Sequence, residues 1–257
     1  MMFNLGMTGT ERLRRITEAV RAAGRLGVAE LAELTGASEM TIRRDLEALA
    51  AQGVVERYRG GARSLLLRGE EPPFALRAQE GLEVKRRIAA EVAGLIADGE
   101  SVVLDSGTTC LEVARALAHR RLTVMPLSLH AVNALTDAPQ LTLLVPGGRP
   151  RPGELALTGP LTEASLTALR FDTAVIGCCG LTAEHGLTAY DLDDAAIKRT
   201  AIGCARRVIA VAEADKLART ALAHVAPATA LHAVVTDAAP DERTGRLAAE
   251  GVPVRTV

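Results

Sequence analysis

The strongest constraint on the fold is an alternation that begins near Leu82 and continues to the end of the chain. Short apolar runs rich in Val, Ile and Leu are each followed by a stretch whose apolar residues have helical spacing. Strands that alternate with helices are typical of βαβ units, in which successive strands of one sheet run parallel. The pattern predicts an α/β fold built on a mostly parallel, doubly wound sheet of roughly six or seven strands.

The apolar runs also place the individual elements. Strands are expected at residues 101–105, 122–127, 141–145, 172–178, 207–212, 234–237 and 252–257. Helices are expected at residues 109–119, 128–136, 161–169, 193–205 and 241–250. Hydrophobic residues make up 48% of the chain, which supplies ample core for a packed domain even though aromatic residues are few.

A proline-containing segment separates this region from the first part of the chain. Pro72 and Pro73 break any helix that would continue through it, and the segment ends near Gly81. We therefore expect a first domain at residues 8–64, a linker at residues 65–81 and a larger domain at residues 82–257.

The first domain is predicted to contain three helices and a basic hairpin. The helices are expected at residues 10–23, at residues 29–34 and from residue 39 onward. Ser38 is placed to cap the third helix, because its hydroxyl can accept a hydrogen bond from a first-turn amide. Residues 54–63 read as two short strands around a glycine pair. This order is typical of a winged helix-turn-helix, whose second helix enters the DNA major groove.

The distribution of charge suits contact with nucleic acid by the first domain only. Residues 1–69 hold 11 Arg and 8 acidic residues, whereas the remainder holds 19 basic and 23 acidic residues. A protein-interaction module with solvated arginines is the alternative, but the cap, the arginine pair and the basic hairpin in this order favour DNA. The residues expected to contact DNA are Ser38, Glu39, Thr41, Arg43, Arg44, Arg57, Arg59, Gly60, Gly61 and Arg63.

The sequence LDSGTTC, residues 104–110, joins an expected strand to an expected helix through small residues. Amides at a helix N-terminus attract anions, and glycine lets the backbone approach a phosphate. An ordinary strand-to-helix turn is the alternative. Other small or polar residues follow neighbouring strands, at the edge where open α/β sheets bind ligands. The residues expected at this site are Asp105, Ser106, Gly107, Thr108, Thr109, Ser128, Gly147, Gly148, Arg151, Lys198 and Lys216.

The four cysteines show no metal-binding spacing. Cys178 and Cys179 lie in an apolar run and are expected on opposite faces of a strand, as reduced core thiols or, alternatively, as a redox switch.

No apolar run reaches the length that spans a membrane, and the N-terminus lacks a secretory apolar segment. We expect a cytoplasmic protein with no cofactor, no metal and no membrane partner.

The segment Ser-x-x-Thr-Ile-Arg-Arg-Asp-Leu, residues 38–46, closely resembles the helix-turn-helix of the DeoR family of bacterial regulators. Arg59 stands where that family usually has His. The resemblance continues through VKRRIA, LDSGTT, the GG-x-x-R segment, TGPL, EHGLT, AAIKR and the region of Lys216. It implies a C-terminal sensor domain with a fold similar to ribose-phosphate isomerases and coenzyme A transferases.

The resemblance also implies a function. The chain would be a repressor of an operon for the uptake or catabolism of a sugar or polyol. It would bind a double-stranded operator as a dimer or tetramer, and a phosphorylated sugar would release it from the DNA. The chain departs from the family at the presumed pocket, where Pro126 and Leu127 replace Thr-Asn, and where residues 177–180 and 188–191 differ from the usual strings. The resemblance therefore predicts no particular effector.

Two alternatives stay open on the sequence alone. One is a DNA-binding regulator that senses no small molecule. The other is a sugar-phosphate isomerase fused to a DNA-binding domain, which needs a carboxylate base to move a proton between adjacent carbons. The two isomerase aspartates correspond, when aligned on Gly177, to Ile176 and Cys179. Neither side chain can serve as that base, so no catalytic residue is expected and the chain is not predicted to be an enzyme.

Overall fold

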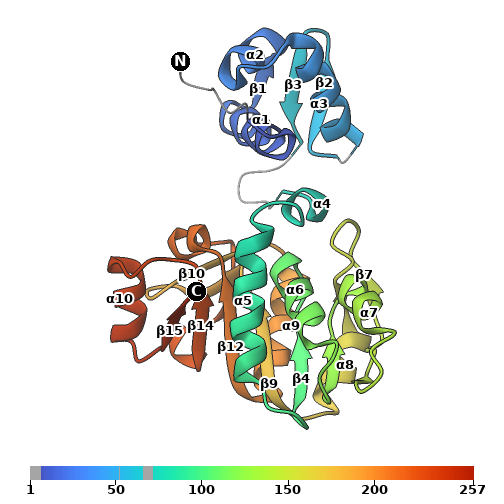
Figure 1. Cartoon of the computed structure of the whole chain (residues 1–257), viewed down its shortest axis with the longest axis vertical. Helices are drawn as coiled ribbons and strands as arrows, with labels where there is room; N and C mark the ends of the chain where they lie inside the picture. Colours follow the sequence, from blue (N-terminus) through green and yellow to red (C-terminus); the bar gives the residue numbers. More distant parts are fainter. Residues whose placement is uncertain (1–6, 52, 66–71) are drawn as a thin grey trace. The chain divides into compact units, whose positions relative to one another are not determined.

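The structure is a computed structural model in which residues 7–51, 53–65 and 72–257 are described (Figure 1). Two compact units, Met1–Glu80 and Gly81–Val257, divide the chain. The predicted linker lies partly outside the described residues, because residues 66–71 are not among them. Its described part contains the short helix α4 (Phe74–Arg77), which begins directly after Pro73. Proline is compatible with the start of a helix, so the proline pair does not keep this segment free of helix.

The described part of the first unit contains the three predicted helices and the predicted hairpin. Besides α4, its elements are α1 (Gly9–Ala23), β1 (Arg25–Gly27), α2 (Val28–Thr35), α3 (Glu39–Ala51), β2 (Val55–Tyr58) and β3 (Gly61–Ser64). The strand order is β1-β3-β2. Strand β1 is not predicted from the sequence, because its three residues are too few to show an alternation. Gly61 permits the pairing of β1 with β3, since a Cβ at that position would lie 2.3 Å from the carbonyl oxygen of Leu26.

Helix α3 is fixed by its apolar face and by its cap. Ile42, Leu46 and Leu49 are buried in a core shared with α1 and α2. Ser38 Oγ accepts a hydrogen bond from the Thr41 amide at 3.2 Å, as predicted for an N-cap. The opposite face of α3 is therefore the face turned to solvent.

Replacing Leu46 with alanine is expected to lower the free energy of unfolding by about 2–5 kcal/mol, because truncating a buried leucine leaves a cavity. Urea unfolding followed by circular dichroism measures the change. Leu34→Ala is the matched control, since Leu34 lies on α2 and is 38% exposed. Its effect should stay within about 0.5 kcal/mol, and equal effects of the two variants would contradict the placement of the buried face.

The second unit is built on a parallel sheet, which confirms the predicted fold class. Within the described residues the strand order is β15-β14-β12-β9-β4-β5-β6, and each neighbouring pair is parallel. The strands are β4 (Ser101–Leu104), β5 (Thr123–Pro126), β6 (Thr142–Leu143), β9 (Phe171–Gly177), β12 (Ala205–Ala212), β14 (Ala233–Thr236) and β15 (Val254–Thr256). The helices are α5 (Leu82–Leu95), α6 (Thr108–Leu117), α7 (Leu129–Leu135), α8 (Pro160–Thr167), α9 (Leu192–Gly203) and α10 (Glu242–Ala249).

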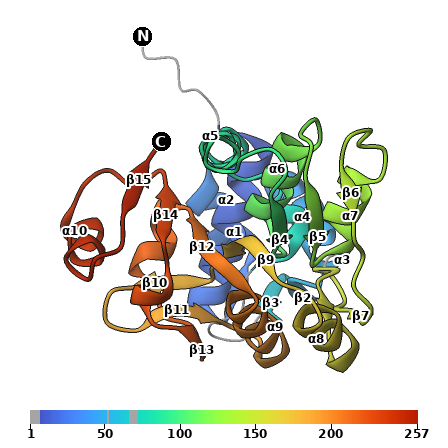
Figure 2. The same cartoon turned by 90° about the horizontal axis from the view of Figure 1, so that it is seen from below.

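Helices cover both faces of this sheet (Figures 1 and 2). Val102 and Leu104 of β4 pack in one apolar cluster with side chains of α5, α6 and α7. Val103, which points to the opposite face, packs in a second cluster with side chains of α8, α9 and α10. Successive residues of a strand alternate between faces, so a strand buried on both sides reads as an unbroken apolar run.

Short elements that are not predicted from the sequence complete the second unit. They are the hairpin β7 (Arg149–Pro150) and β8 (Leu157–Thr158), a small antiparallel sheet of β10 (Gly180–Thr182), β11 (Gly186–Ala189) and β13 (Ala223–Ala226), and the 3₁₀ helices η1 (Ala214–Ala218) and η2 (Ala228–Ala230). Strands of two to four residues carry too little pattern to be recognised before the fold is known.

The prediction that Cys178 and Cys179 lie on opposite faces of a strand is wrong. Strand β9 ends at Gly177, so both residues lie in the connection to β10. The Cys179 amide donates to the carbonyl oxygen of Thr188 in β11 at 3.3 Å. The chain therefore leaves the main sheet for the small antiparallel one at this point.

In the part of the chain that the structure describes, none of the helices combines the length and apolarity that crossing a membrane requires.

Candidate DNA interface and effector site

The outward face of α3 carries the predicted recognition residues. Glu39, Arg43 and Arg44 are exposed and Thr41 is half-exposed, while the apolar residues of the same helix are buried. The hairpin adds Arg57, Arg59 and Arg63, whose side chains are also exposed. The first unit thus combines an exposed helix with a basic hairpin, the geometry with which a winged helix-turn-helix reads a major groove and grips the adjacent backbone.

Three of these arginines are held by carboxylates on the protein surface. Arg43 pairs with Glu39 at 3.0 Å, Arg57 with Glu47 at 2.7 Å, and Arg63 with Glu56. Among the described residues, Arg44 and Arg59 have no ion-pair partner. Exposed pairs of this kind contribute about 0–1 kcal/mol, so phosphate groups can compete for the paired arginines.

A further ion pair, which is not predicted from the sequence, fixes α3 against α1. Arg12 donates to Asp45 through Nε at 2.6 Å and through Nη2 at 3.2 Å, and both side chains are largely buried. The hydrogen bonds to Asp45 raise the pKa of Arg12 above its ordinary value. Because the two residues are far apart in the sequence, no local pattern connects them before the fold is known.

The centre of the predicted effector site is a buried ion pair at the carboxyl edge of the parallel sheet. Asp105 follows β4 and is 1% exposed, and Lys198 on α9 is 3% exposed. The Lys198 ammonium donates to Oδ2 of Asp105, and the same oxygen accepts the Gly177 amide at 2.9 Å. Asp194, one turn before Lys198 on α9, lies 3.4 Å from the ammonium. One buried carboxylate thus joins β4, β9 and α9.

The electrostatics of the cluster keep Lys198 charged. Burial lowers the pKa of Lys198, but the carboxylates of Asp105 and Asp194 outweigh this effect, and the pKa lies well above its ordinary value. Lys198 is therefore an ammonium whose charge the two neighbouring carboxylates already balance, and the cluster holds the end of β4 against α9.

The N-terminus of α6 lies directly after this pair. Gly107 is the N-cap with φ 98°, and no side chain caps the helix. A Cβ at Gly107 would meet no atom within 4 Å, so the space beside the cap is open. Among the described residues no acceptor is found for the amides of Thr108 and Thr109. The first amides of a helix lack partners within the helix and carry its positive dipole, which together favour an anion.

Other predicted effector residues have structural partners of their own. Ser128 caps α7 by accepting the Ala131 amide at 3.2 Å. Gly147 accepts a hydrogen bond from Thr162 on α8 at 2.7 Å, and a Cβ on Gly148 would lie 2.0 Å from the Thr162 hydroxyl. The glycine pair therefore allows its loop to pack against α8. Lys216 lies in η1, directly after β12.

Arg151 connects to the buried pair through α9. Its guanidinium lies 3.5 Å from the carboxylate of Asp191, which caps α9 by accepting the Asp194 amide at 2.8 Å. The Nε atom of Arg151 is buried and has no hydrogen-bond partner among the described residues. Asp105, Lys198 and Arg151 are thus brought into one chain of contacts, from widely separated parts of the sequence.

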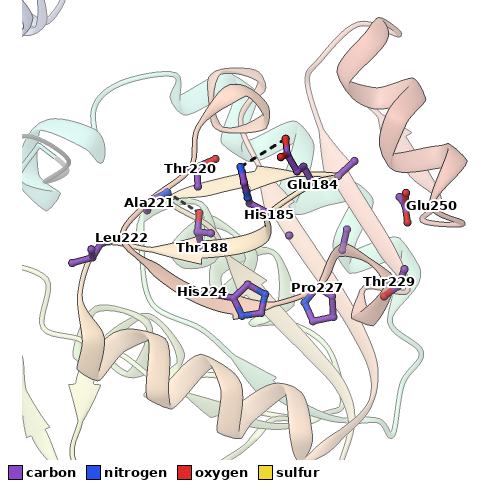
Figure 3. A pocket seen from close by; sticks show the side chains of 13 residues that line it. Glu184, His185, Thr188, Thr220, Ala221, Leu222, His224, Pro227, Thr229 and Glu250 are labelled. Atoms are coloured by element: carbon purple, nitrogen blue, oxygen red, sulfur yellow. Dashed lines mark hydrogen bonds and ion pairs between the residues drawn. The ribbon is translucent and has the colours of Figure 1, made fainter.

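Two cavities lie elsewhere in the second unit, and neither is lined by a residue predicted for the effector. The first, of about 460 Å³, lies at the small antiparallel sheet and is lined by Glu184, His185, His224 and Glu250 among others (Figure 3). The second, of about 430 Å³, lies between α6 and α7, and its lining includes Leu111 and Arg115 of α6. The described residues include no group of three or more His, Cys, Asp or Glu placed to hold a metal ion.

Known proteins share this arrangement of domains. Residues 12–66 match the DeoR-like helix-turn-helix domain, and residues 80–238 match the DeoR C terminal sensor domain. The chain is 32% identical to the glycerol-3-phosphate regulon repressor of Escherichia coli (strain K12), over 91% of this chain and 93% of that protein. The chain belongs to the DeoR family of transcriptional regulators. A second relative in this family is the transcriptional repressor AccR of Agrobacterium fabrum, which is 33% identical over 92% of each chain.

Both relatives are named as repressors, in agreement with the prediction of a regulator and not an enzyme. Among solved structures, the DeoR-family chain has a TM-score of 0.40 to ribose 5-phosphate isomerase A from Methanocaldococcus jannaschii, with 15% identity over 53% of this chain and 55% of that chain. A likeness of this degree does not bear on function.

The buried ion pair of Lys198 and Asp105 is expected to contribute to the stability of the second unit. Lys198→Met leaves two carboxylates without their cation and is expected to cost about 3–5 kcal/mol of unfolding free energy. Adding Asp105→Asn should recover part of this loss, because the more deeply buried charge is then removed as well. Urea unfolding measures both variants, with Asp193→Asn on the exposed start of α9 as the control. A loss below about 1 kcal/mol for Lys198→Met would show that the ion pair does not hold β4 and α9 together.

Proposed function

We propose that this DeoR-family chain is a repressor that binds a double-stranded operator through its first unit and releases it when a phosphorylated sugar or polyol binds in the second unit. In this proposal residues 8–64 contact DNA, residues 82–257 sense the effector and residues 65–81 connect them. The observation that carries the effector half is the uncapped N-terminus of α6, with open space at Gly107. The exposed arginines of α3 and the hairpin support the DNA half.

The phosphate group is proposed to lie against the amides of Thr108 and Thr109, where the hydroxyls of Ser106 and Thr108 add donors. Asp105 and Lys198 then hold the end of β4 against α9 and position the loop, because their charged atoms already contact each other. Ser128 and the glycine pair at 147–148 shape the neighbouring loops. Arg151 and Lys216 are proposed to supply further positive charge to the anionic ligand.

The cavity between α6 and α7 supports the same placement. Leu111, one turn beyond Thr108 on α6, is among its lining residues. The lining also includes Arg115, His130 and Asn133, which can hydrogen-bond sugar hydroxyls. Its volume of about 430 Å³ is that of a small-molecule pocket. A phosphate at the N-terminus of α6 would therefore leave room nearby for the carbon chain of its sugar.

Regulation follows from differential binding. We propose that the chain acts as a homo-oligomer whose paired recognition helices enter successive major grooves, about 34–36 Å apart. An effector that binds better to a different spacing of the heads shifts the population away from the DNA-bound state. Linkage then requires operator DNA to weaken effector binding by the same factor.

The two alternatives are weaker. An isomerase needs a carboxylate at the position of Ile176 or Cys179, and Ile176 is buried in the apolar core. A regulator without any effector, the second alternative, would leave the N-terminus of α6 without a ligand.

The cavity at His185 and His224 is the main competing location for an effector, because it has comparable volume and polar side chains.

Arg44→Ala is expected to weaken operator binding and to reduce the slope of log affinity against log salt by about 1, because one phosphate contact is lost. Fluorescence anisotropy with a labelled operator duplex at several salt concentrations measures both quantities. Arg206→Ala removes an exposed arginine from the second unit and is the charge-matched control. An unchanged slope for Arg44→Ala would place this residue away from the DNA.

Thr109→Glu is expected to abolish the response to the effector while leaving operator binding intact, because its carboxylate occupies the anion site. Wild type should be stabilised by about 2.7 kcal/mol at a ligand concentration 100 times the Kd. Thermal unfolding with a panel of sugar phosphates measures this shift, and Thr109 is half-exposed, so the variant should fold. His224→Ala in the other cavity is the control. Loss of the response in His224→Ala, with Thr109→Glu normal, would move the effector to that cavity.

A further inference from the structure

One exposed apolar side chain lies in the middle of the proposed DNA-reading face. Met40 is the second residue of α3 and is 60% exposed. It contributes nothing to the core of the first unit, which α3 reaches through Ile42, Leu46 and Leu49. A single exposed hydrophobic residue is ordinary on a protein surface, so the position of Met40, rather than its exposure, carries the argument.

Helical geometry places Met40 between the two arginines of α3. Residues three and four apart are neighbours on a helix surface, so Arg43 and Arg44 both lie one turn beyond Met40 and on either side of it. Glu39 precedes it and is paired with Arg43. The N-terminal turn of α3 therefore presents an apolar centre with a guanidinium on each side. In a helix-turn-helix, this first turn is the part that reaches the base edges.

The major groove offers one apolar group to such a centre. Its base edges carry hydrogen-bond donors and acceptors, and thymine alone adds a methyl group at C5. Methionine suits this contact because its thioether side chain is flexible and polarizable. We infer that Met40 is a specificity-determining residue that packs against the methyl group of a thymine in the operator. This inference rests on the proposed DNA-binding function and adds to it the base that α3 selects.

The test uses a chemical change that removes only the methyl group. Operator duplexes are first selected from a randomised library with the full-length chain. Each thymine of the selected sequence is then replaced in turn by uracil, which keeps every hydrogen-bonding group. For the wild type, uracil at one thymine of each half-site should weaken binding about fourfold, the factor given by about 0.8 kcal/mol for one methyl-sized group.

Two variants of Met40 and one control complete the design. Met40→Ala and Met40→Gln should bind the thymine and uracil duplexes with equal affinity, because neither offers the same apolar contact. Leu34→Ala removes an exposed leucine from the neighbouring helix α2 and should keep the fourfold difference. Circular dichroism confirms that each variant is folded.

The outcomes separate the inference from the function on which it rests. Selection of no sequence by the wild type would overturn DNA recognition itself. A selected operator with no thymine that is sensitive to uracil would overturn the role of Met40 alone. So would a sensitivity that persists in both Met40 variants, since another residue would then contact the methyl group.

Discussion

The second unit depends on the contact between the Lys198 ammonium and the Asp105 carboxylate at the edge of the parallel sheet. The same carboxylate oxygen accepts the Gly177 amide, so the end of β4 is tied both to β9 and to α9. Water is excluded from both side chains. Buried charges are tolerated only when they are paired and hydrogen-bonded, and this arrangement fixes the loop that leads into α6. The open N-terminus of α6 is therefore held in place by contacts within the protein that form without a ligand.

Much of this fold could be predicted, because burial on both sides of a parallel sheet leaves unbroken apolar runs in the sequence. The strands β4, β9 and β12 and the helices α6 and α9 lie close to their predicted positions. The stripe of Ile42 and Leu46 likewise predicted α3. The short elements β1, β7 and β10 could not be predicted, because two or three residues show no period. Their existence depends on contacts made after the larger elements have packed.

The candidate site was predictable only in its local parts. The residues 105–109 share one loop and could be recognised from their order, and Lys198 was expected at the same sheet edge. Its pairing with Asp105, and the pairing of Arg12 with Asp45, join residues 93 and 33 positions apart and follow only from the fold. The two units also differ in how their positive charges are placed. The predicted DNA-contacting arginines of the first unit are exposed, whereas Lys198 is enclosed and bonded to Asp105.

An anionic metabolite is proposed to bind at the uncapped start of α6. Amide ¹H–¹⁵N resonances of the full chain, recorded during titration with sugar phosphates, test this placement. Saturable shifts are expected, largest for Gly107, Thr108 and Thr109, as their amides gain an acceptor. Shifts confined to the cavity at His185 and His224, with the α6 amides unmoved by every phosphate that binds, would contradict it.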